Sequence, residues 1–458
     1  MKKYAFLFVN FCLILALSSC SNDDYTKALP TASTALMYVD ADKSGGVGSD
    51  DLLQRLLHTD GVGGLDLAKR IYFFELADGS AGMCARVSDA KKVGETLEKL
   101  AKNGRCREIS ELGGVQTAVL DSVFGQKVLA YDDNALLVMN LATATEMQAT
   151  KKRLVRYLKQ DGDRSEKFTR LFEKLNAMES PIAAVGRGQT LLKTFTFDLP
   201  DGLDASQVMD AISYTLENGV FYAKNRRFSF NEKVDKALNE SEKILRPIQG
   251  RYDPMMSSEA FLGLMINVEG GQLLPKIQNE EMVKATLAAA NAVIDMNNIV
   301  KSIDGEVAVN YFGNLMFGDG KYSLAAELAH SEWLADVGYW KTSCPKGSEI
   351  KDWGKDSYCY TDRQSVLYFG VVGEPKNARS SASSQSSLQF FCGNTSEVAD
   401  SPLQPVQKPI SADVAEKIKG SRFALVMNME KAVYGQLMKA VCEPFVGDFH
   451  TYVYTLEQ

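Results

Sequence analysis

The sequence predicts an α+β protein made of two similar halves, each an antiparallel β-sheet with packed helices. Short apolar segments rich in β-branched and aromatic residues alternate with polar turns, which is typical of strands. Tight turns join several of these strands, which favours antiparallel pairing. The order of strands and helices in the first half returns in the second half, which indicates an internal duplication.

In the first half, the opening strand is an apolar segment bounded by Pro30 and the Gly45-Gly46 pair. Asp78-Gly79 is expected to form the turn of a hairpin. Ser88 is expected to cap a helix whose apolar residues recur at helical spacing. The expected strands are 35–39, 71–76, 81–87, 107–112, 115–121 and 126–140, and the expected helices are 50–57, the segment after Ser88, and 145–178.

The second half repeats this order. A strand at 261–266 precedes helices to about residue 303, and a glycine-rich turn at 318–320 joins strands at 306–312 and 322–329. Four matched segments lie 228, 243, 241 and 240 residues apart, and we interpret them as a duplication with insertions. They pair Leu36-Met37 with Leu264-Met265, Ser88 with Ser331, residues 182–185 with 423–426, and residues 214–217 with 454–457.

The expected domain boundaries follow from this repeat. The segment from Pro247 to Ser258 is polar and contains two prolines and a glycine, so it is the preferred boundary between the halves. We therefore expect a signal peptide at 1–19, an acidic tether at 20–33, a first α+β unit at 34–258 and a second α+β unit at 259–458.

The first twenty residues predict export and lipidation. Lys2 and Lys3 precede an apolar segment that is too short to span a bilayer, which requires about 20 apolar residues. Leu17-Ser18-Ser19-Cys20 resembles a bacterial lipobox, in which the cysteine is acylated, for example with palmitate, and becomes the mature N-terminus. Cys20 is therefore the predicted lipidation site and the predicted membrane attachment. The alternative is an ordinary signal peptide that contains a cysteine.

The residues after Cys20 predict the location. Ser21-Asn22-Asp23-Asp24 is a short acidic tag, and residue 21 is not the aspartate of inner-membrane retention signals. An outer-membrane location is expected. Paired acids after the cysteine also resemble a surface-export signal, so exposure at the cell surface is a second expectation. The alternative is that the acids only solvate a tether.

Composition limits the partners. Removal of residues 1–19 takes away two lysines and changes the formal net charge from −7 to −9. A surface of this sign disfavours nucleic acid and anionic lipid as partners. The sequence contains no zinc, thioredoxin-like or phosphate-loop motif, and no cofactor is expected. The expected partners are the membrane, through the N-terminal lipid, and a protein or glycan ligand.

The N-terminal region also supports a family resemblance. The lipobox, the acidic tag and the segment Leu-Pro-Thr-Ala-Ser-Thr-Ala-Leu-Met-Tyr-Val-Asp at 29–40 resemble a Bacteroidetes outer-membrane lipoprotein family of unknown function. The resemblance is a pattern along most of the chain. It implies the location and the fold, and brings no known activity or catalytic residues.

One segment of the sequence resembles a calcium-binding loop. Asp40, Asp42, Ser44 and Asp51 occupy ligand positions of an EF-hand loop. The preceding element is a predicted strand, the last ligand is Asp in place of the bidentate Glu, and the second half lacks these ligands. The favoured interpretation is a polar turn, and the sequence leaves calcium binding open.

The candidate binding surface lies at 344–360. Trp353 falls in a polar segment predicted as a loop, with Tyr358 and Tyr360 beside it. A disulfide between Cys344 and Cys359 would fix this loop and display the three rings for a sugar or an apolar side chain. The alternative is a mobile loop whose tryptophan covers the sheet.

Two classes of function remain open. The first is a non-catalytic binding or envelope-assembly lipoprotein. The second is a secreted hydrolase whose active site is assembled from dispersed residues. No nucleophile elbow or other catalytic motif occurs in the sequence, so no catalytic residue is assigned and the binding class is favoured.

Overall fold

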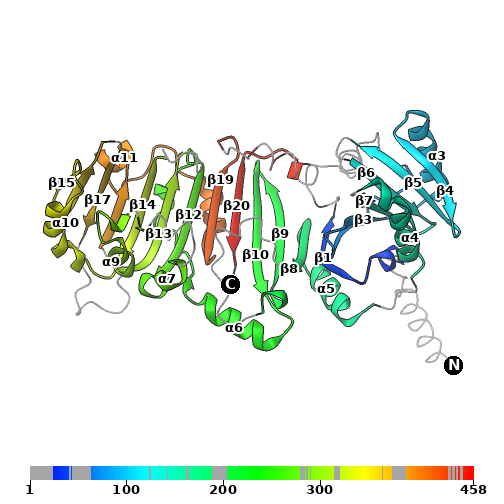
Figure 1. The fold of residues 1–458 in the computed structure, drawn as a ribbon, viewed down its shortest axis with the longest axis horizontal. Helices are drawn as coiled ribbons and strands as arrows, with labels where there is room; N and C mark the ends of the chain where they lie inside the picture. Colours follow the sequence, from blue (N-terminus) through cyan, green and yellow to red (C-terminus); the bar gives the residue numbers. More distant parts are fainter. Residues whose placement is uncertain are drawn as a thin grey trace, which may run out of the picture. The chain divides into compact units, whose positions relative to one another are not determined.

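The structure of this protein is a computed structural model, and its contacts divide the chain into two compact units, Met1–Gly186 and Arg187–Gln458. Figure 1 shows the elements of each unit. No helix in the described part of the chain is long and apolar enough to cross a membrane. The described residues are 24–457 without 41, 42, 44–62, 123, 124, 142, 161–163, 188–203, 279–283, 285, 286, 289, 314–319, 364, 374–387, 432–434, 436–438, 440, 441 and 444–446.

The first unit is one antiparallel sheet. Its order is β8-β1-β2-β3-β7-β6-β5-β4, and every pairing is antiparallel. Gly79 has a positive φ of 80° in the predicted turn between β2 and β3, a conformation that glycine adopts without strain. The strands are β1 Ser33–Val39, β2 Ile71–Leu76, β3 Ala81–Arg86, β4 Cys106–Leu112, β5 Val115–Ser122, β6 Gly125–Tyr131, β7 Ala135–Asn140 and β8 Ile182–Arg187.

Helices α3 (Ala90–Lys102), α4 (Met147–Leu158) and α5 (Glu166–Asn176) pack on this sheet. The predicted helix after Ser88 is present, but its cap is Asp89, whose carboxylate accepts from the Lys92 amide at 3.1 Å. Ser88 instead donates to the Gly64 carbonyl oxygen. The prediction that Ser88 caps the helix was therefore wrong by one residue, because Asp caps as well as Ser.

The segment predicted as a tether packs into the first unit from Asp24 onward. Residues Asp24–Ala28 form a 3-10 helix, η1, and Tyr25 is 3% exposed. The Tyr25 hydroxyl donates to the Arg70 carbonyl oxygen at 2.9 Å. Leu29 is fully buried, and Gln160 donates to its carbonyl oxygen at 2.7 Å. The folded body therefore begins within a few residues of Cys20.

The second unit contains a longer sheet. Its order is β9-β10-β20-β19-β12-β13-β14-β18-β17-β16-β15, and β11 pairs with the end of β12. All pairings are antiparallel except β10 with β20. The strands are β9 Met209–Glu217, β10 Val220–Phe228, β11 Leu245–Arg246, β12 Leu262–Glu269, β13 Ile303–Tyr311, β14 Tyr322–Leu328, β15 Glu349–Gly354, β16 Ser357–Thr361, β17 Val366–Val372, β18 Gln389–Gly393, β19 Phe423–Asn428 and β20 Thr451–Leu456.

Short helices accompany this sheet. Ser331 precedes the 3-10 helix η6 (Glu332–Asp336) but makes no side-chain cap bond. Trp333 and Trp340 are buried and stacked with ring centroids 5.9 Å apart, so both are core residues. The other described helices are α6 Glu232–Glu242, the 3-10 helix η5 Asp253–Met255, α7 Gly270–Ile277, α9 Met296–Lys301, α10 Val337–Ser343, α11 Ser396–Asp400 and α12 Ala412–Ile418.

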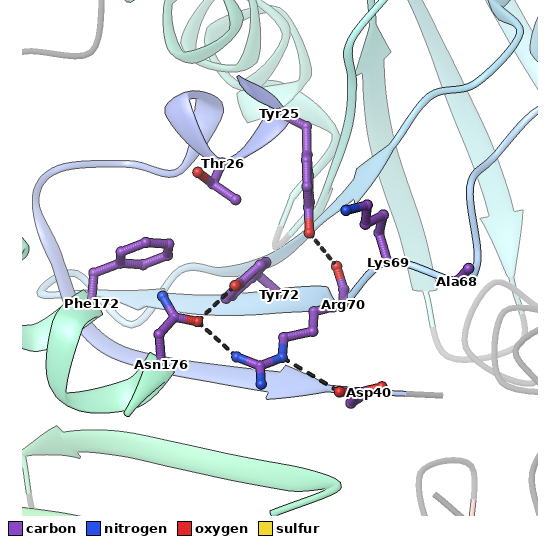
Figure 2. A pocket seen from close by; sticks show the side chains of 9 residues that line it. All are labelled: Tyr25, Thr26, Asp40, Ala68, Lys69, Arg70, Tyr72, Phe172 and Asn176. Atoms are coloured by element: carbon purple, nitrogen blue, oxygen red, sulfur yellow. Dashed lines mark hydrogen bonds and ion pairs between the residues drawn. The ribbon is translucent and has the colours of Figure 1, made fainter. Parts of the chain in front are cut away.

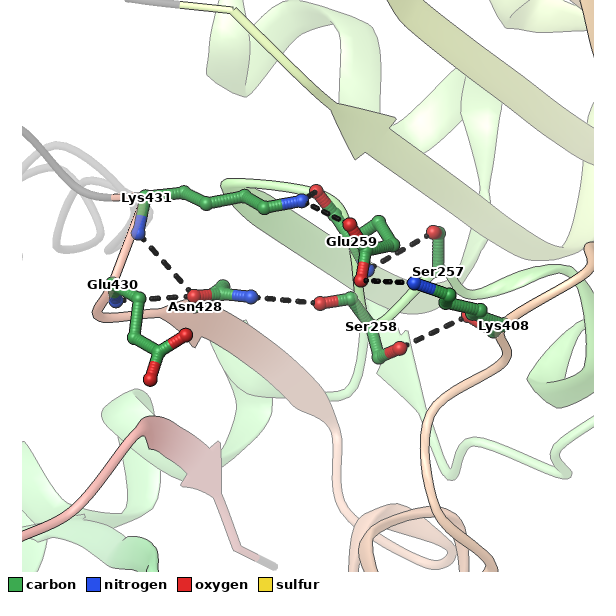
Figure 3. Close-up of polar contacts among 7 residues, drawn as sticks. All are labelled: Ser257, Ser258, Glu259, Lys408, Asn428, Glu430 and Lys431. Carbon is green, nitrogen blue, oxygen red and sulfur yellow. Dashed lines mark hydrogen bonds and ion pairs between the residues drawn. The ribbon is translucent and has the colours of Figure 1, made fainter.

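The segment predicted as the boundary, Pro247 to Ser258, is packed into the second unit. Ile248, Tyr252 and Met256 join one buried cluster with residues of α12 and the sheet. At the end of the segment, Asn428 donates to the Ser258 carbonyl oxygen at 2.9 Å, as Figure 3 shows. The units divide at Gly186 instead, because β10 pairs with β20 and brings β9 and β10 into the second sheet.

Ion pairs fasten the same end of the segment. The Glu259 carboxylate lies between the Lys408 ammonium, at 3.2 Å, and the Lys431 ammonium (Figure 3). These charges are exposed, so each pair stabilises the fold only weakly.

The predicted combination of antiparallel strands with packed helices is confirmed.

Candidate functional site

The first unit contains a pocket of about 470 Å³ at the point where β1 ends and β2 begins. Its volume falls in the range of small-ligand sites, about 300–1,000 Å³. Figure 2 shows that η1, the two strand ends and the end of α5 surround it. The lining residues are Tyr25, Thr26, Asp40, Ala68, Lys69, Arg70, Tyr72, Phe172 and Asn176.

Arg70 is fixed at the base of the pocket by three contacts. Its Nη1 donates to Asn176 Oδ1 at 3.0 Å, and its Nε lies 3.5 Å from Asp40 Oδ2. The guanidinium also stacks 4.0 Å above the Tyr38 ring. Burial alone would lower the pKa of Arg70, but Tyr38, Tyr72 and Asp40 raise it above its ordinary value. The pocket therefore contains a permanent, preorganised cation.

Asn176 points hydrogen-bond donors into the pocket. Its Oδ1 accepts from both Arg70 and the Tyr72 hydroxyl, the latter at 2.8 Å. Since the amide oxygen faces these donors, the amide nitrogen must face the other way, toward Phe172 (Figure 2). This nitrogen has no hydrogen-bond acceptor among the described residues. A ligand that presents oxygen acceptors would satisfy it.

Aromatic rings form the walls. Tyr72 lies 6.1 Å from Tyr25 and 5.5 Å from Phe172, measured between ring centroids. The Arg164 guanidinium packs 4.4 Å above the outer wall residue Phe172 and donates to the Thr26 hydroxyl at 2.9 Å. The pocket thus combines apolar walls, which suit a flat or apolar group, with donors that suit a polar, acceptor-rich group.

A second polar cluster lies in the second unit, around Glu306. Its buried carboxylate accepts from three successive backbone amides, those of Gln249, Gly250 (2.8 Å) and Arg251 (2.6 Å). Glu327, also buried, accepts from the Glu306 amide and from the Arg251 guanidinium. Because protein donors already surround these oxygens, the two carboxylates hold the fold together and are not presented to a substrate.

Asp253 borders this cluster and titrates unusually. Burial raises its pKa to about 6, and the Glu306 and Glu416 carboxylates add to the rise while the Lys419 ammonium opposes it. Its Oδ1 is buried without a hydrogen-bond partner in the described part of the chain. The neutral acid is therefore the form that the folded protein favours below about pH 6.

We predict that Asp253 makes the fold less stable as the pH rises. The unfolded chain releases this proton near 3.8 and the folded chain near 6, so the folded state binds the extra proton between these values. The free energy of unfolding of Asp253→Asn, relative to that of the wild type, should rise by about 1 kcal/mol from about pH 4 to about pH 7. This value is discounted for solvent screening. Urea unfolding at several pH values measures this difference.

The matched control is Asp204→Asn. Asp204 is exposed and its pKa is lowered, first by hydrogen bonding to Ser206. This substitution should give no gain in the same pH window. Parallel pH profiles of the wild type and Asp253→Asn would show that Asp253 does not carry the raised pKa.

The structure separates the predicted surface residues. The predicted loop is the hairpin of β15 and β16, and Trp353 is 51% exposed with its ring 4.8 Å from Tyr368. Tyr358 instead packs 5.5 Å from Phe369, the next residue along β17. Neighbouring strand residues point to opposite faces, so Trp353 lies on one face of the hairpin and Tyr358, with Tyr360, on the other. The three rings do not form one surface.

Cys344 and Cys359 are both free thiols in the structure. Cys344 ends α10, which lies on the face of Tyr358, since the Lys341 ammonium is 5.2 Å from that ring. Cys359 alternates with Tyr358 along β16 and points to the opposite face. The predicted disulfide is absent because the hairpin lies between the two thiols.

Other candidate residues fall differently. Cys20, Asp42, Ser44 and Asp51 lie outside the described residues. Asp40 is described, and its carboxylate faces the cations Arg70 and Lys43, at 3.5 and 3.7 Å. Nearby cations oppose a bound calcium ion.

Sequence reasoning missed Arg70, Asn176 and the rest of the pocket. The only local signal is that Arg70 directly precedes the otherwise apolar strand β2, as Asp40 directly follows β1. Antiparallel pairing of these strands brings the two charges together at one edge of the sheet. Nothing in the sequence points to Asn176.

Comparison with known proteins places the chain in a family. No curated protein and no solved structure matches the chain significantly. One family matches residues 38–447, and its description is Domain of unknown function (DUF4836). Because the match covers most of the chain, the protein belongs to this family of unknown function.

Proposed function

We propose that this protein is a lipid-anchored outer-membrane lipoprotein that binds a ligand in the pocket of its first unit without chemical conversion. The observation that carries the binding role is Arg70, which is positioned by Asp40, Asn176 and Tyr38 before any ligand arrives. A preorganised charge loses little entropy on binding, which is the property of a recognition site. Exposure at the cell surface is part of the proposal.

Chain length supports a site close to the membrane. Tyr25, a wall of the pocket, is five residues beyond Cys20. An extended chain spans at most about 3.6 Å per residue, so a lipid on Cys20 would keep Asp24 within about 14 Å of the membrane surface. The proposed site would therefore meet ligands at the membrane surface.

We also propose that the two sheets arose by internal duplication. The order β8-β1-β2-β3-β7-β6-β5-β4 in the first unit corresponds strand by strand to β19-β12-β13-β14-β18-β17-β16-β15 in the second. Each first strand follows a 3-10 helix near a buried tyrosine, Tyr25 or Tyr252. Four residues after that tyrosine comes a buried apolar residue, Leu29 or Met256. This agreement supports the proposed duplication.

We predict that Cys20→Ala releases the protein from membranes, because the lipid is the proposed attachment. Fractionation of cells followed by a salt wash measures the release. Cys12→Ala, which alters a cysteine in the apolar part of the signal and keeps the lipobox, should leave the protein in the membrane fraction. Retention of Cys20→Ala with washed membranes would contradict the lipid anchor.

The binding role is tested by photocrosslinking in cells. Phe172 lines the pocket, and Tyr339 is 71% exposed in the second unit, so the photoreactive residue p-benzoylphenylalanine is placed at one of these aromatic positions at a time. We predict a discrete adduct from position 172 that the same probe at position 339 does not give. Equal labelling from both positions, or no adduct from position 172, would contradict a ligand site in the pocket.

A further inference from the structure

The pocket has a counterpart in the second unit. Tyr38 pairs with Tyr72 in the first sheet, and Met265 pairs with Ala308 in the second. We align the two sheets so that the pair Tyr38–Tyr72 corresponds to the pair Met265–Ala308. The Tyr38 hydroxyl donates to the backbone after α5, and Met265 and Ala308 pack with α12, so α5 and α12 lie on the same face of their sheets. The alignment also matches Tyr25 with Tyr252. The sequence match of Leu36-Met37 with Leu264-Met265 was therefore wrong by one residue, because Tyr38 corresponds to Met265.

This alignment places Arg70 and Glu306 at equivalent positions, each two residues before the paired residue of the second strand. In the second unit, the chain itself occupies the site. The backbone amides of residues 249–251 donate to the Glu306 carboxylate, and this segment leads directly into Tyr252. The occupant is therefore a short piece of peptide backbone, read through its polar groups.

At the equivalent position of the first unit, the charged side chain is the cation Arg70 in place of the anion Glu306. A carboxylate accepts from N–H donors, whereas the Arg70 guanidinium donates to oxygens and pairs best with a carboxylate. The Asn176 amide nitrogen adds donors on the Phe172 side of the pocket. The pocket lining contains two cations, Lys69 and Arg70, and one carboxylate, Asp40, although the whole chain has a net charge of −7. A local positive site in an acidic protein selects an anionic ligand.

We propose that the pocket of the first unit binds an acidic peptide segment. A side-chain carboxylate would lie on Arg70, and the peptide backbone would lie between Tyr25, Tyr72 and Phe172, with a carbonyl oxygen accepting from the Asn176 amide nitrogen. The inference rests on the proposed binding function of this pocket. A peptide is favoured over an acidic sugar because the equivalent site of the second unit contains peptide backbone.

The test is calorimetric titration of the full chain with a capped hexapeptide that carries two central aspartates. The matched probes are the same peptide with asparagines and free glucuronate. The aspartate peptide should bind at least about tenfold more tightly than either, since hydrogen bonds to charged groups contribute factors of this size. Tighter binding of glucuronate, or equal binding of the two peptides, overturns the proposal.

Two variants locate the binding. Lys69→Gln and Arg70→Gln should each weaken it about tenfold. Lys69→Gln preserves the contacts of Arg70 with Asp40 and Asn176, so it stays informative if Arg70→Gln fails to fold. Lys91→Gln, at a side chain that is 87% exposed on α3, should leave the affinity unchanged. Unchanged affinity in Lys69→Gln overturns the assignment.

The chain's own acidic tag is the remaining occupant to exclude. A double-mutant cycle of Arg70→Gln and Asp23→Asn measures whether the two substitutions have coupled effects on the free energy of unfolding. If they are coupled and no peptide binds, the tag fills the pocket and the proposal fails. Photocrosslinking at position 172 distinguishes failure of the acidic-peptide inference from failure of the proposed binding function. An adduct in cells without peptide binding overturns only the acidic-peptide inference, whereas absence of both overturns the binding function.

Discussion

The second unit depends on one interaction, the binding of three successive backbone amides by the buried Glu306 carboxylate. A buried charge is costly unless donors surround it, and here the backbone of residues 249–251 supplies them. The interaction fastens the segment that carries Tyr252 and Met256 into the core against β12 and α12. This segment, which contains η5, thereby becomes part of the buried core of the second unit.

The same place in the first unit has the opposite charge. Arg70 replaces the acid, Tyr25 takes the place of Tyr252, and a pocket of about 470 Å³ lies between them and α5. If the proposed duplication and the proposed binding function both hold, one copy keeps its site filled by its own backbone for stability, and the other uses the site for a ligand. Stability and recognition then use the same geometry with exchanged donors and acceptors.

The sequence predicts elements whose signals are local. The hairpin of β2 and β3 follows from the turn at Asp78-Gly79, and the helix after position 88 follows from its apolar spacing. The sequence predicts a loop where the edge strand β15 lies, because the side chains of β15 are mostly polar and exposed, as an edge strand permits. The sequence predicts a tether where the packed segment after Asp24 lies, because Tyr25 and Leu29 are its only large apolar residues.

Long-range contacts account for what sequence reasoning missed. The division at Gly186 depends on the pairing of β10 with β20, which are more than two hundred residues apart. The pocket depends on Arg70, directly before β2, meeting Asn176, at the end of α5 and 106 residues away. Neither residue type is unusual at its position, so only the fold reveals the site.

Hydrogen–deuterium exchange of the full chain, with and without the aspartate peptide, tests the central claim most directly. We expect slow exchange at residues 249–251 in both samples, because Glu306 binds their amides. Added peptide should slow exchange only in segments that line the pocket, around residues 66–76 and 168–178. Rapid exchange at 249–251, or peptide-dependent protection there and not around Arg70, would contradict the account.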